Sequence, residues 1–270
     1  MTTILYDALG PRARRRMGVG TTVGAVLLAG LLSLALLRLS DHGQLSGELW
    51  SVLLNADLRQ LLVDGLVATL RVAGVSLLLS LGFGMVLAVG RLARQPWLRV
   101  PVRIWVEVFR GLPLLLLIFF IFLGAPAVGV NVSTFWALTI GISLYNSAVI
   151  SEIIRAGILS LPRGQTEAAY AIGLSGAATM RLIILPQAVR LMLPALISQM
   201  VVLLKETSLG FIIGYTELLR NGRIAVEYLG GSYAIAVYTE IAFVYLAVNL
   251  LLSWAASTVD RRMTRGPATK

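Results

Sequence analysis

Five ionisable side chains stand inside or beside long apolar stretches of the sequence: Glu107, Arg110, Glu152, Lys205 and Glu206. A charged group in such a stretch is costly, so each is a candidate for binding or gating. Glu107 and Arg110 are three residues apart and would share a helix face, so a simple ion pair between them is the structural alternative. Glu152 and Arg155 have the same spacing and the same alternative.

Lys205 and Glu206 are neighbours in sequence and cannot face each other on a helix, so each needs another partner. Thr207 and Ser208 follow directly and add two hydroxyl groups. This polar cluster near the end of an apolar stretch is our candidate for the substrate or gating region. A packing role without any contact to substrate is the alternative.

Composition indicates that the apolar stretches that carry these groups are surrounded mainly by lipid. Apolar residues make up 57% of the 270 residues and charged residues 13%, against roughly a quarter charged in soluble domains. The net charge of +10 collects in short loops between apolar runs, as expected for cytoplasmic loops of a membrane protein and not for a nucleic-acid binder. The sequence has no cysteine and one histidine, His42, which excludes thiolate chemistry and offers no metal site.

Six stretches are long enough to cross a bilayer, which takes about 20 mostly apolar residues. A signal peptide is a poor alternative for the first, because its apolar run is too long and lacks a cleavage pattern. Arginines flank the inner ends, so both termini are predicted to be cytoplasmic. The predicted spans are Val19–Leu39, Gly65–Gly90, Ile104–Leu123, Phe135–Ile154, Leu182–Ile213 (broken at Pro194 and Gly210) and Tyr233–Ala256.

The segments between the spans are too short for a separate soluble domain. Residues 40–64 are predicted to lie outside, with an interfacial helix near Trp50, and Leu218–Ser232 is predicted to be polar and outside. We divide the chain into 1–63, with the first span, a core domain 64–262, and a tail 263–270. The core includes the cytoplasmic loop 155–180.

That loop carries the most informative pattern. Thr166 is predicted to cap a short helix whose first turn holds Glu167. Ala168 and Ala169 keep one face slim, and Gly173 permits a reversal at the helix end. Such a helix suits docking into a groove of a partner protein, and an ordinary amphipathic connector is the alternative.

The spacing E-A-A-x3-G-x9-I-x-L-P, which runs from Glu167 through Gly173 to Pro186, resembles the signature of ABC-importer permeases. The segments Glu107–Pro113, Asn146-Ser147, Glu152–Gly157 and Leu204–Leu209 resemble the polar amino acid uptake branch of that family. The likeness covers about Asp64 to Arg262. Leu5–Ala8 and Gly10-Pro11 further resemble the longer permease subunit of actinobacterial glutamate uptake systems.

The resemblance implies an all-α membrane protein with a type I ABC-importer transmembrane domain, a five-helix core plus one N-terminal helix. It implies two ATP-binding subunits, a second permease subunit, an extracytoplasmic substrate-binding protein, and alternating access driven by ATP. This sequence has no phosphate-binding loop of the Walker type, so it is expected to bind no cofactor and to be no enzyme, with ATP and Mg on the partners.

The resemblance also implies roles for residues of this sequence. Coupling to the ATPase falls to Glu167, Ala168, Ala169 and Gly173. The substrate pathway or gate falls to Asn146, Ser147, Lys205, Glu206, Thr207, Ser208, Glu107 and Arg110.

Two departures from the branch pattern concern the partner subunit. Leu112 and Leu117 stand where the branch commonly has threonine and glutamine, which favours an unlike second permease that supplies more of the polar contacts. Glutamate or another acidic amino acid is the expected cargo, with glutamine or a basic amino acid as alternatives. A membrane enzyme would need a convergent acid–base or metal set, and a channel would need a pore loop or charged ring; the sequence offers neither.

Overall fold

The computed structural model describes residues 10–264, and within them the chain forms helices and loops but no strand. The long helices are α1 (Pro11–Asp41), α3 (Ala56–Leu92), α6 (Thr134–Leu159), α9 (Leu185–Glu206) and α11 (Ala234–Thr264). The shorter helices are α2 (Gly47–Ser51), α4 (Pro96–Gly111), α5 (Leu114–Ala127), α7 (Arg163–Ala171), α8 (Gly176–Thr179) and α10 (Leu218–Leu229). Single turns of other helix types are η1 (Val52–Leu54), η2 (Met180–Ile184), η3 (Thr207–Phe211) and η4 (Gly231–Tyr233).

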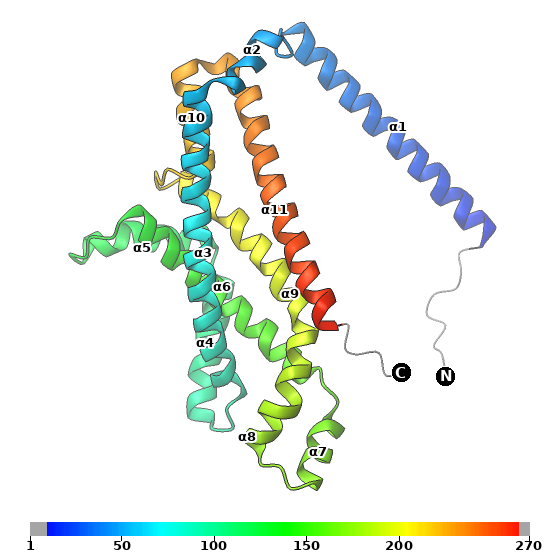
Figure 1. The fold of residues 1–270 in the computed structure, drawn as a ribbon, viewed down its shortest axis with the longest axis vertical. Helices are drawn as coiled ribbons and strands as arrows, with labels where there is room; N and C mark the ends of the chain where they lie inside the picture. Colours follow the sequence, from blue (N-terminus) through cyan, green and yellow to red (C-terminus); the bar gives the residue numbers. More distant parts are fainter. Residues whose placement is uncertain (1–9, 265–270) are drawn as a thin grey trace.

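Five described segments are long and apolar enough to cross a membrane, and the bent pair of α4 and α5 makes a sixth if it counts as one span. This confirms the all-α membrane fold. In Figure 1 the hairpin of α7 and α8 lies at one end of the molecule, while α2 and the end of α10 lie at the other. The start of α1 and the end of α11 both point toward the α7–α8 end, as expected for two cytoplasmic termini.

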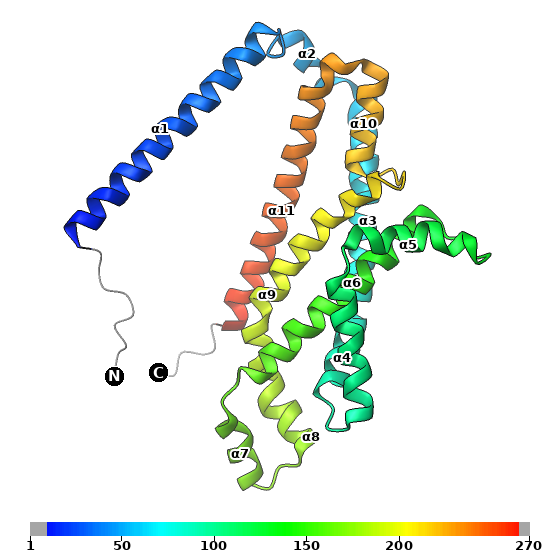
Figure 2. The same ribbon diagram turned by 180° about the vertical axis from the view of Figure 1, so that it is seen from behind.

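The helices α3, α6, α9 and α11 form the bundle, and α1 diverges from it beyond α2 (Figures 1 and 2). Large apolar side chains along α1 are exposed. Residues 1–9 and 265–270 lie outside the described residues, so the N-terminal pattern Leu5–Ala8 and the last basic residues Arg265 and Lys270 have no structural account here.

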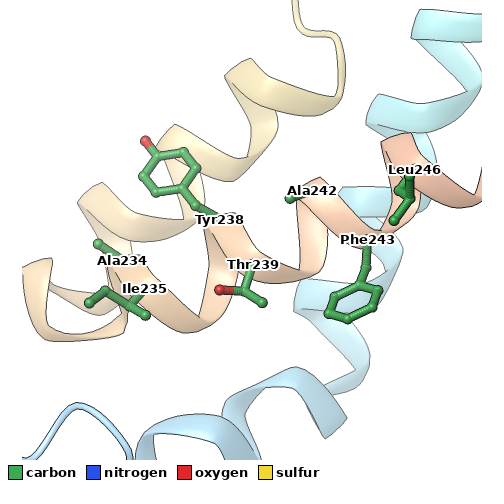
Figure 3. A pocket seen from close by; sticks show the side chains of 7 residues that line it. All are labelled: Ala234, Ile235, Tyr238, Thr239, Ala242, Phe243 and Leu246. Atoms are coloured by element: carbon green, nitrogen blue, oxygen red, sulfur yellow. The ribbon is translucent and has the colours of Figure 1, made fainter. Parts of the chain in front are cut away.

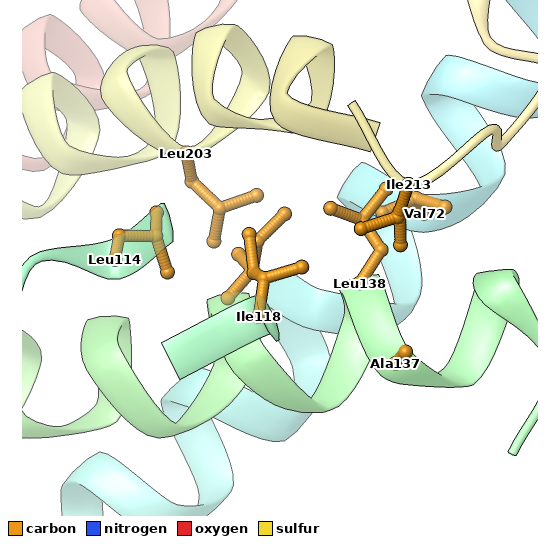
Figure 4. Packing of buried hydrophobic residues seen from close by; sticks show 8 residues of the cluster. Val72, Leu114, Ile118, Ala137, Leu138, Leu203 and Ile213 are labelled. Atoms are coloured by element: carbon orange, nitrogen blue, oxygen red, sulfur yellow. The ribbon is translucent and has the colours of Figure 1, made fainter. Parts of the chain in front are cut away.

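One apolar cluster joins four helices near the middle of the bundle (Figure 4). Val72 of α3, Ile118 of α5, Leu138 of α6 and Leu203 of α9 are buried together. Gly141 permits this packing, because a Cβ atom there would stand 2.7 Å from Ile118 Cγ1. Since lipid is as apolar as these side chains, close packing rather than escape from water holds the helices together.

The third predicted span, Ile104–Leu123, is not one straight helix. α4 and α5 meet at 98°, and the residue between them, Leu112, has extended backbone angles of φ −81° and ψ 136°. Proline disfavours helical angles at the residue before it, so Pro113 ends α4. The predicted span Ile104–Leu123 is therefore a bent pair of helices and not one straight helix.

Two other boundaries differ from the sequence prediction. Leu218–Ser232 is not simply a polar outer segment, because Leu218, Asn221 and Ala225 of α10 are buried. α10 packs against α3 and α11. In the fifth span α9 continues through Pro194 and gives way to the tighter turn η3 only after Glu206.

Candidate functional site

A buried polar network links α6 to α9 inside the apolar bundle. The side chain of Asn146 is fully buried, and its Nδ2 donates to Glu206 Oε2 at 2.6 Å and to the Ile142 carbonyl at 3.0 Å. Gln199 Nε2 donates to Asn146 Oδ1 at 2.6 Å. Asn146 therefore holds two side chains of α9 in one hydrogen-bonded group.

Helix periodicity explains why α9 supplies both partners. Gln199 and Glu206 are seven residues apart, which places them on one face two turns from each other. α9 ends at Glu206, and the hydroxyl of Thr207 donates to the Leu204 carbonyl at 2.7 Å where η3 begins. The carboxylate of Glu206 therefore lies at a change of helix type, where the backbone is less regular than in the middle of a span.

Lys205 points away from this network. Its side chain is exposed, and within residues 10–264 it makes no ion pair. Ser208 is half-buried and its hydroxyl donates to the Lys205 carbonyl at 2.8 Å. Ser147 is buried and donates to the Leu144 carbonyl of its own helix at 2.8 Å. Among the predicted pathway residues that the structure describes, Asn146 and Glu206 form the one side-chain hydrogen bond between two helices.

Glu107 and Arg110 belong to a different place, in the last turns of α4, a helix that packs against α3 and α6. Glu107 does not pair with Arg110; its Oε1 lies 3.7 Å from Arg91 Nη2 instead. Glu152 does pair with Arg155, at 2.5 Å, and also meets Arg91 Nη1 at 2.7 Å. The ion pair within α4, offered by the spacing as the structural alternative, is not formed because α3 supplies a tertiary partner. The alternative pair within α6 is confirmed.

The sequence analysis missed two residues: Gln199, which belongs to the Asn146 network, and Arg91, which belongs to the ionic group with Glu107 and Glu152. Gln199 is a polar residue inside the apolar run Leu182–Ile213, at helical spacing from Glu206. That spacing was a usable signal. Arg91 is one of the arginines that flank the inner ends of the predicted spans, and no local pattern links it to Glu107 or Glu152.

The cytoplasmic loop folds into the hairpin α7–α8. α7 ends with two bonds of a Schellman motif, from the Gly173 amide to the Tyr170 carbonyl at 3.0 Å and from the Leu174 amide to the Ala169 carbonyl at 3.1 Å. Gly173 has φ +83°, which confirms the predicted reversal and favours glycine.

The start of α7 differs from the prediction. The helix begins at Arg163, directly after Pro162, and no side chain caps it. Thr166 therefore lies inside the helix, and Glu167 lies beyond the first turn. Proline at the N-cap fixes the backbone angle that starts the helix earlier than expected.

The two faces of α7 differ in exposure. Ala169 is buried against the protein, and Gln187 of α9 donates to Gln165 at 3.3 Å. Glu167 and Ala168 are exposed, and Ile172 at the end of the helix is 76% exposed. One side of α7 thus packs against the bundle. The other side, with the carboxylate of Glu167 and the exposed side chain of Ile172, lies open beyond the end of the spans.

An apolar groove on α11 has few polar groups that could bind an amino acid. One side of α11 carries a groove of about 490 Å³, shown in Figure 3, whose polar lining groups are Tyr238 and Thr239. Two hydroxyl groups cannot neutralise the charges of an amino acid. In the part of the chain that the structure describes, no group of three or more acidic, histidine or cysteine side chains could hold a metal ion.

Comparison with known proteins shows what this arrangement is similar to. The glutamate transport system permease protein GluD of Corynebacterium glutamicum is 39% identical over 236 residues, 86% of each chain. The probable glutamine ABC transporter permease protein GlnP of Bacillus subtilis is 41% identical over 202 residues, 74% of this chain and 93% of its own.

Solved structures give the same fold. A crystal structure of an amino acid ABC transporter with histidines superposes with a TM-score of 0.71 and 31% identity, over 76% of this chain and 94% of that one. An inward-facing methionine transporter MetNI, at 22% identity and a TM-score of 0.66 over 78% of this chain and 100% of that one, supports the fold alone. Residues 80–265 match the family described as the binding-protein-dependent transport system inner membrane component, and the chain belongs to that family of multi-pass plasma-membrane proteins.

Proposed function

We propose that this protein is the permease subunit of an ATP-driven amino acid importer, with glutamate or another acidic amino acid as its cargo. The observation that carries the transport role is the hairpin α7–α8, an exposed short helix anchored to the bundle from one side only. A surface of this kind transmits movement between a membrane bundle and a cytoplasmic partner. Family membership and the names of the relatives support the same role.

Coupling would act through Glu167, Ala168, Ala169 and Gly173. Glu167 and Ala168 form the exposed contact surface, buried Ala169 fixes the helix against the bundle, and Gly173 sets the angle of the hairpin. Two ATPase subunits would supply the partner grooves and bind ATP and Mg. This chain would hydrolyse nothing itself.

The pathway would run past Asn146, Gln199 and Glu206. Glu206 is a half-buried carboxylate that accepts an amide hydrogen bond and makes no ion pair within the described residues. Such a carboxylate is suited to an ammonium group or to a change of partner when the helices move. Lys205, Thr207, Ser208 and Ser147 would line or support this region. Glu107 lies in the ionic group with Arg91, and Arg110 follows three residues later on α4; both would act on the inner side of the pathway.

The acidic cargo is favoured by a similarity that spans most of the chain. The glutamate permease of C. glutamicum is matched over 86% of this chain, and the E. coli permease named for glutamate and aspartate is 34% identical over 74% of it. The alternative is glutamine, which the 41% identity to the B. subtilis glutamine permease favours.

A second, unlike permease would complete the pathway. Leu117 of α5 is buried and Leu112 lies half-buried at the bend between α4 and α5. Both positions are therefore apolar where the branch commonly carries polar groups. The partner permease would supply those groups, and an extracytoplasmic binding protein would deliver the cargo.

Uptake into vesicles tests this function. The chain, its ATPase, its second permease and its binding protein are reconstituted together, and uptake of labelled glutamate is followed with and without ATP. We expect ATP-dependent uptake that unlabelled aspartate reduces and that omission of the second permease abolishes. ATP-dependent uptake of glutamine, unaffected by glutamate, would replace the acidic cargo, and undiminished uptake without the second permease would refute the unlike pair.

A further inference from the structure

A polar cavity of about 710 Å³ opens near the cytoplasmic ends of α3, α4 and α6. It is separate from the Asn146 network, because Glu152, the cavity residue of α6 nearest to Asn146 in sequence, is about 1.7 helical turns away from it. Its charged lining residues are Arg91, Arg99, Arg103, Glu107, Glu152 and Arg155.

The charges of this cavity do not balance. Four arginines face two glutamates, and both glutamates are already engaged. Glu152 lies 2.7 Å from Arg91 and 2.5 Å from Arg155. Within the described residues, Arg99 and Arg103 have no carboxylate within 4.0 Å. The cavity therefore holds two guanidinium groups available to an anion.

The two available arginines are positioned together by α4. They are four residues apart, so they project from one face of that helix. The inward side chain of Arg91, which is only 10% exposed, holds α3 against the same carboxylates. A guanidinium group matches phosphate or carboxylate oxygens with paired hydrogen bonds, and two of them suit a phosphate.

The surroundings are those of a membrane edge. Trp97, at the start of α4, is exposed, as are Met85 and Val89 of α3. Met85 and Val89 lie on the same helical face as Leu92, which lines the cavity. An apolar strip of α3 thus leads from the lipid-facing span to the arginines, and Trp97 stands at the level where tryptophan prefers the headgroups.

We propose that this cavity binds the phosphate of an anionic phospholipid from the cytoplasmic leaflet, with Arg99 and Arg103 as ligands and the acyl chains along Met85 and Val89. A free amino acid fits less well, because its ammonium group would need a carboxylate, and both carboxylates face arginines: Glu152 pairs with Arg91 and Arg155, and Glu107 lies 3.7 Å from Arg91. The lipid would fix α4 against α3 and α6 at the inner edge of the membrane.

Lipid retention by the intact importer tests this site. The complete complex in detergent is titrated with phosphatidylglycerol or phosphatidylcholine, and bound lipid is counted by native mass spectrometry. The test variant is Arg99→Gln with Arg103→Gln. The matched control is Arg94→Gln, because Arg94 is exposed in the same α3–α4 connection and does not line the cavity.

We expect the wild type and Arg94→Gln to retain phosphatidylglycerol in preference to phosphatidylcholine. Each arginine near an anionic membrane contributes roughly a fivefold change in affinity, so the double variant should bind about 25-fold more weakly. If the double variant does not assemble, Arg103→Gln alone should lose about fivefold. Equal retention by variant and control would overturn the proposal.

Two competition arms identify the source of the anion. Inorganic phosphate at millimolar concentration should leave the bound lipid in place, because it lacks acyl chains. Displacement of lipid by inorganic phosphate would show a soluble-phosphate site instead. Displacement by glutamate would show a cargo site, and either result would overturn the lipid assignment. Neither arm depends on uptake, so the result is independent of the proposed cargo.

Discussion

The polar groups inside the bundle and the residues on the cytoplasmic hairpin α7–α8 differ in whether they have partners within the chain. Asn146 and Glu206 are partnered within the chain by short hydrogen bonds. Glu167 and Ala168 on α7 are exposed, and within the described residues Glu167 takes part in no ion pair. The interior polar groups thus find their hydrogen-bond partners within this chain, whereas the exposed face of α7 remains open to a partner protein.

This contrast separates stability from coupling. A change in the interior network should lower the stability of the folded chain, because a buried polar group left without a partner is costly. A change on the open face of α7 should leave stability unchanged and impair transport, because Glu167 and Ala168 are exposed within the described part of the chain. Three measurements can break or refine this division.

The largest effect is expected for Asn146→Ala. The substitution removes the donor to Glu206 and the acceptor of Gln199, so a half-buried carboxylate and a half-buried amide both lose a partner. We expect the free energy of unfolding to fall by about 3 kcal/mol, measured by denaturant unfolding of the purified protein in detergent. Ser147→Ala is the matched control, since Ser147 bonds only to its own helix, and a loss below about 1 kcal/mol is expected. Equal losses would mean that the network does not stabilise the bundle.

A smaller effect in free energy, confined to transport, is expected for Glu167→Lys. Because Glu167 is exposed and unpaired in the described structure, the unfolding transition should move by no more than about 0.5 kcal/mol. ATP-driven uptake should fall about tenfold or more, equivalent to about 1.4 kcal/mol, as the reversed charge opposes docking. Glu48→Lys makes the same charge change on exposed Glu48, at the far end of the molecule, and should leave uptake intact. Normal uptake by Glu167→Lys would remove α7 from the coupling role.

The sequence predicted those features that depend on local or periodic patterns. Apolar runs gave the spans, and glycine at position 173 gave the reversal after α7. The bend between α4 and α5 was also readable, because Pro113 restricts Leu112, yet the apolar run across it favoured one span. The pattern of Leu218, Asn221 and Ala225 likewise indicated a buried helix face inside a segment that its charges marked as outer.

Partner choice could not be predicted in the same way. Glu107 has Arg110 at helical spacing, but Arg91 of another helix lies nearer. Asn146 meets Glu206 across 60 residues of sequence and Gln199 across 53. Such contacts depend on how the helices pack, and side-chain spacing within one helix contains no information about that packing.

Another carboxylate in the interior of the protein, Glu217 in the loop before α10, allows a further test of the interior polar groups. It is fully buried, and its oxygens accept from the amides of Leu219 at 2.9 Å and Arg220 at 2.8 Å and from the Tyr245 hydroxyl at 3.0 Å. Burial nevertheless raises the pKa of Glu217 above its ordinary value, because desolvation outweighs the two amides and the hydroxyl. The folded protein therefore binds this proton more tightly than the unfolded chain does.

The smallest expected effect is a dependence of the unfolding free energy on pH that arises from Glu217. Between the unfolded pKa, about 4.3, and the higher folded pKa, the folded state holds more protons, so this group's contribution to stability is fullest below the window and is lost as pH rises through it. Glu217→Gln keeps the shape but cannot ionise. The difference in unfolding free energy between wild type and Glu217→Gln should therefore decline as pH rises from about 4 toward neutrality. A difference that grows with pH would mean that the two amides and Tyr245 outweigh burial, so that the interior of the bundle stabilises a carboxylate as a charge and not only as a hydrogen-bonded acid.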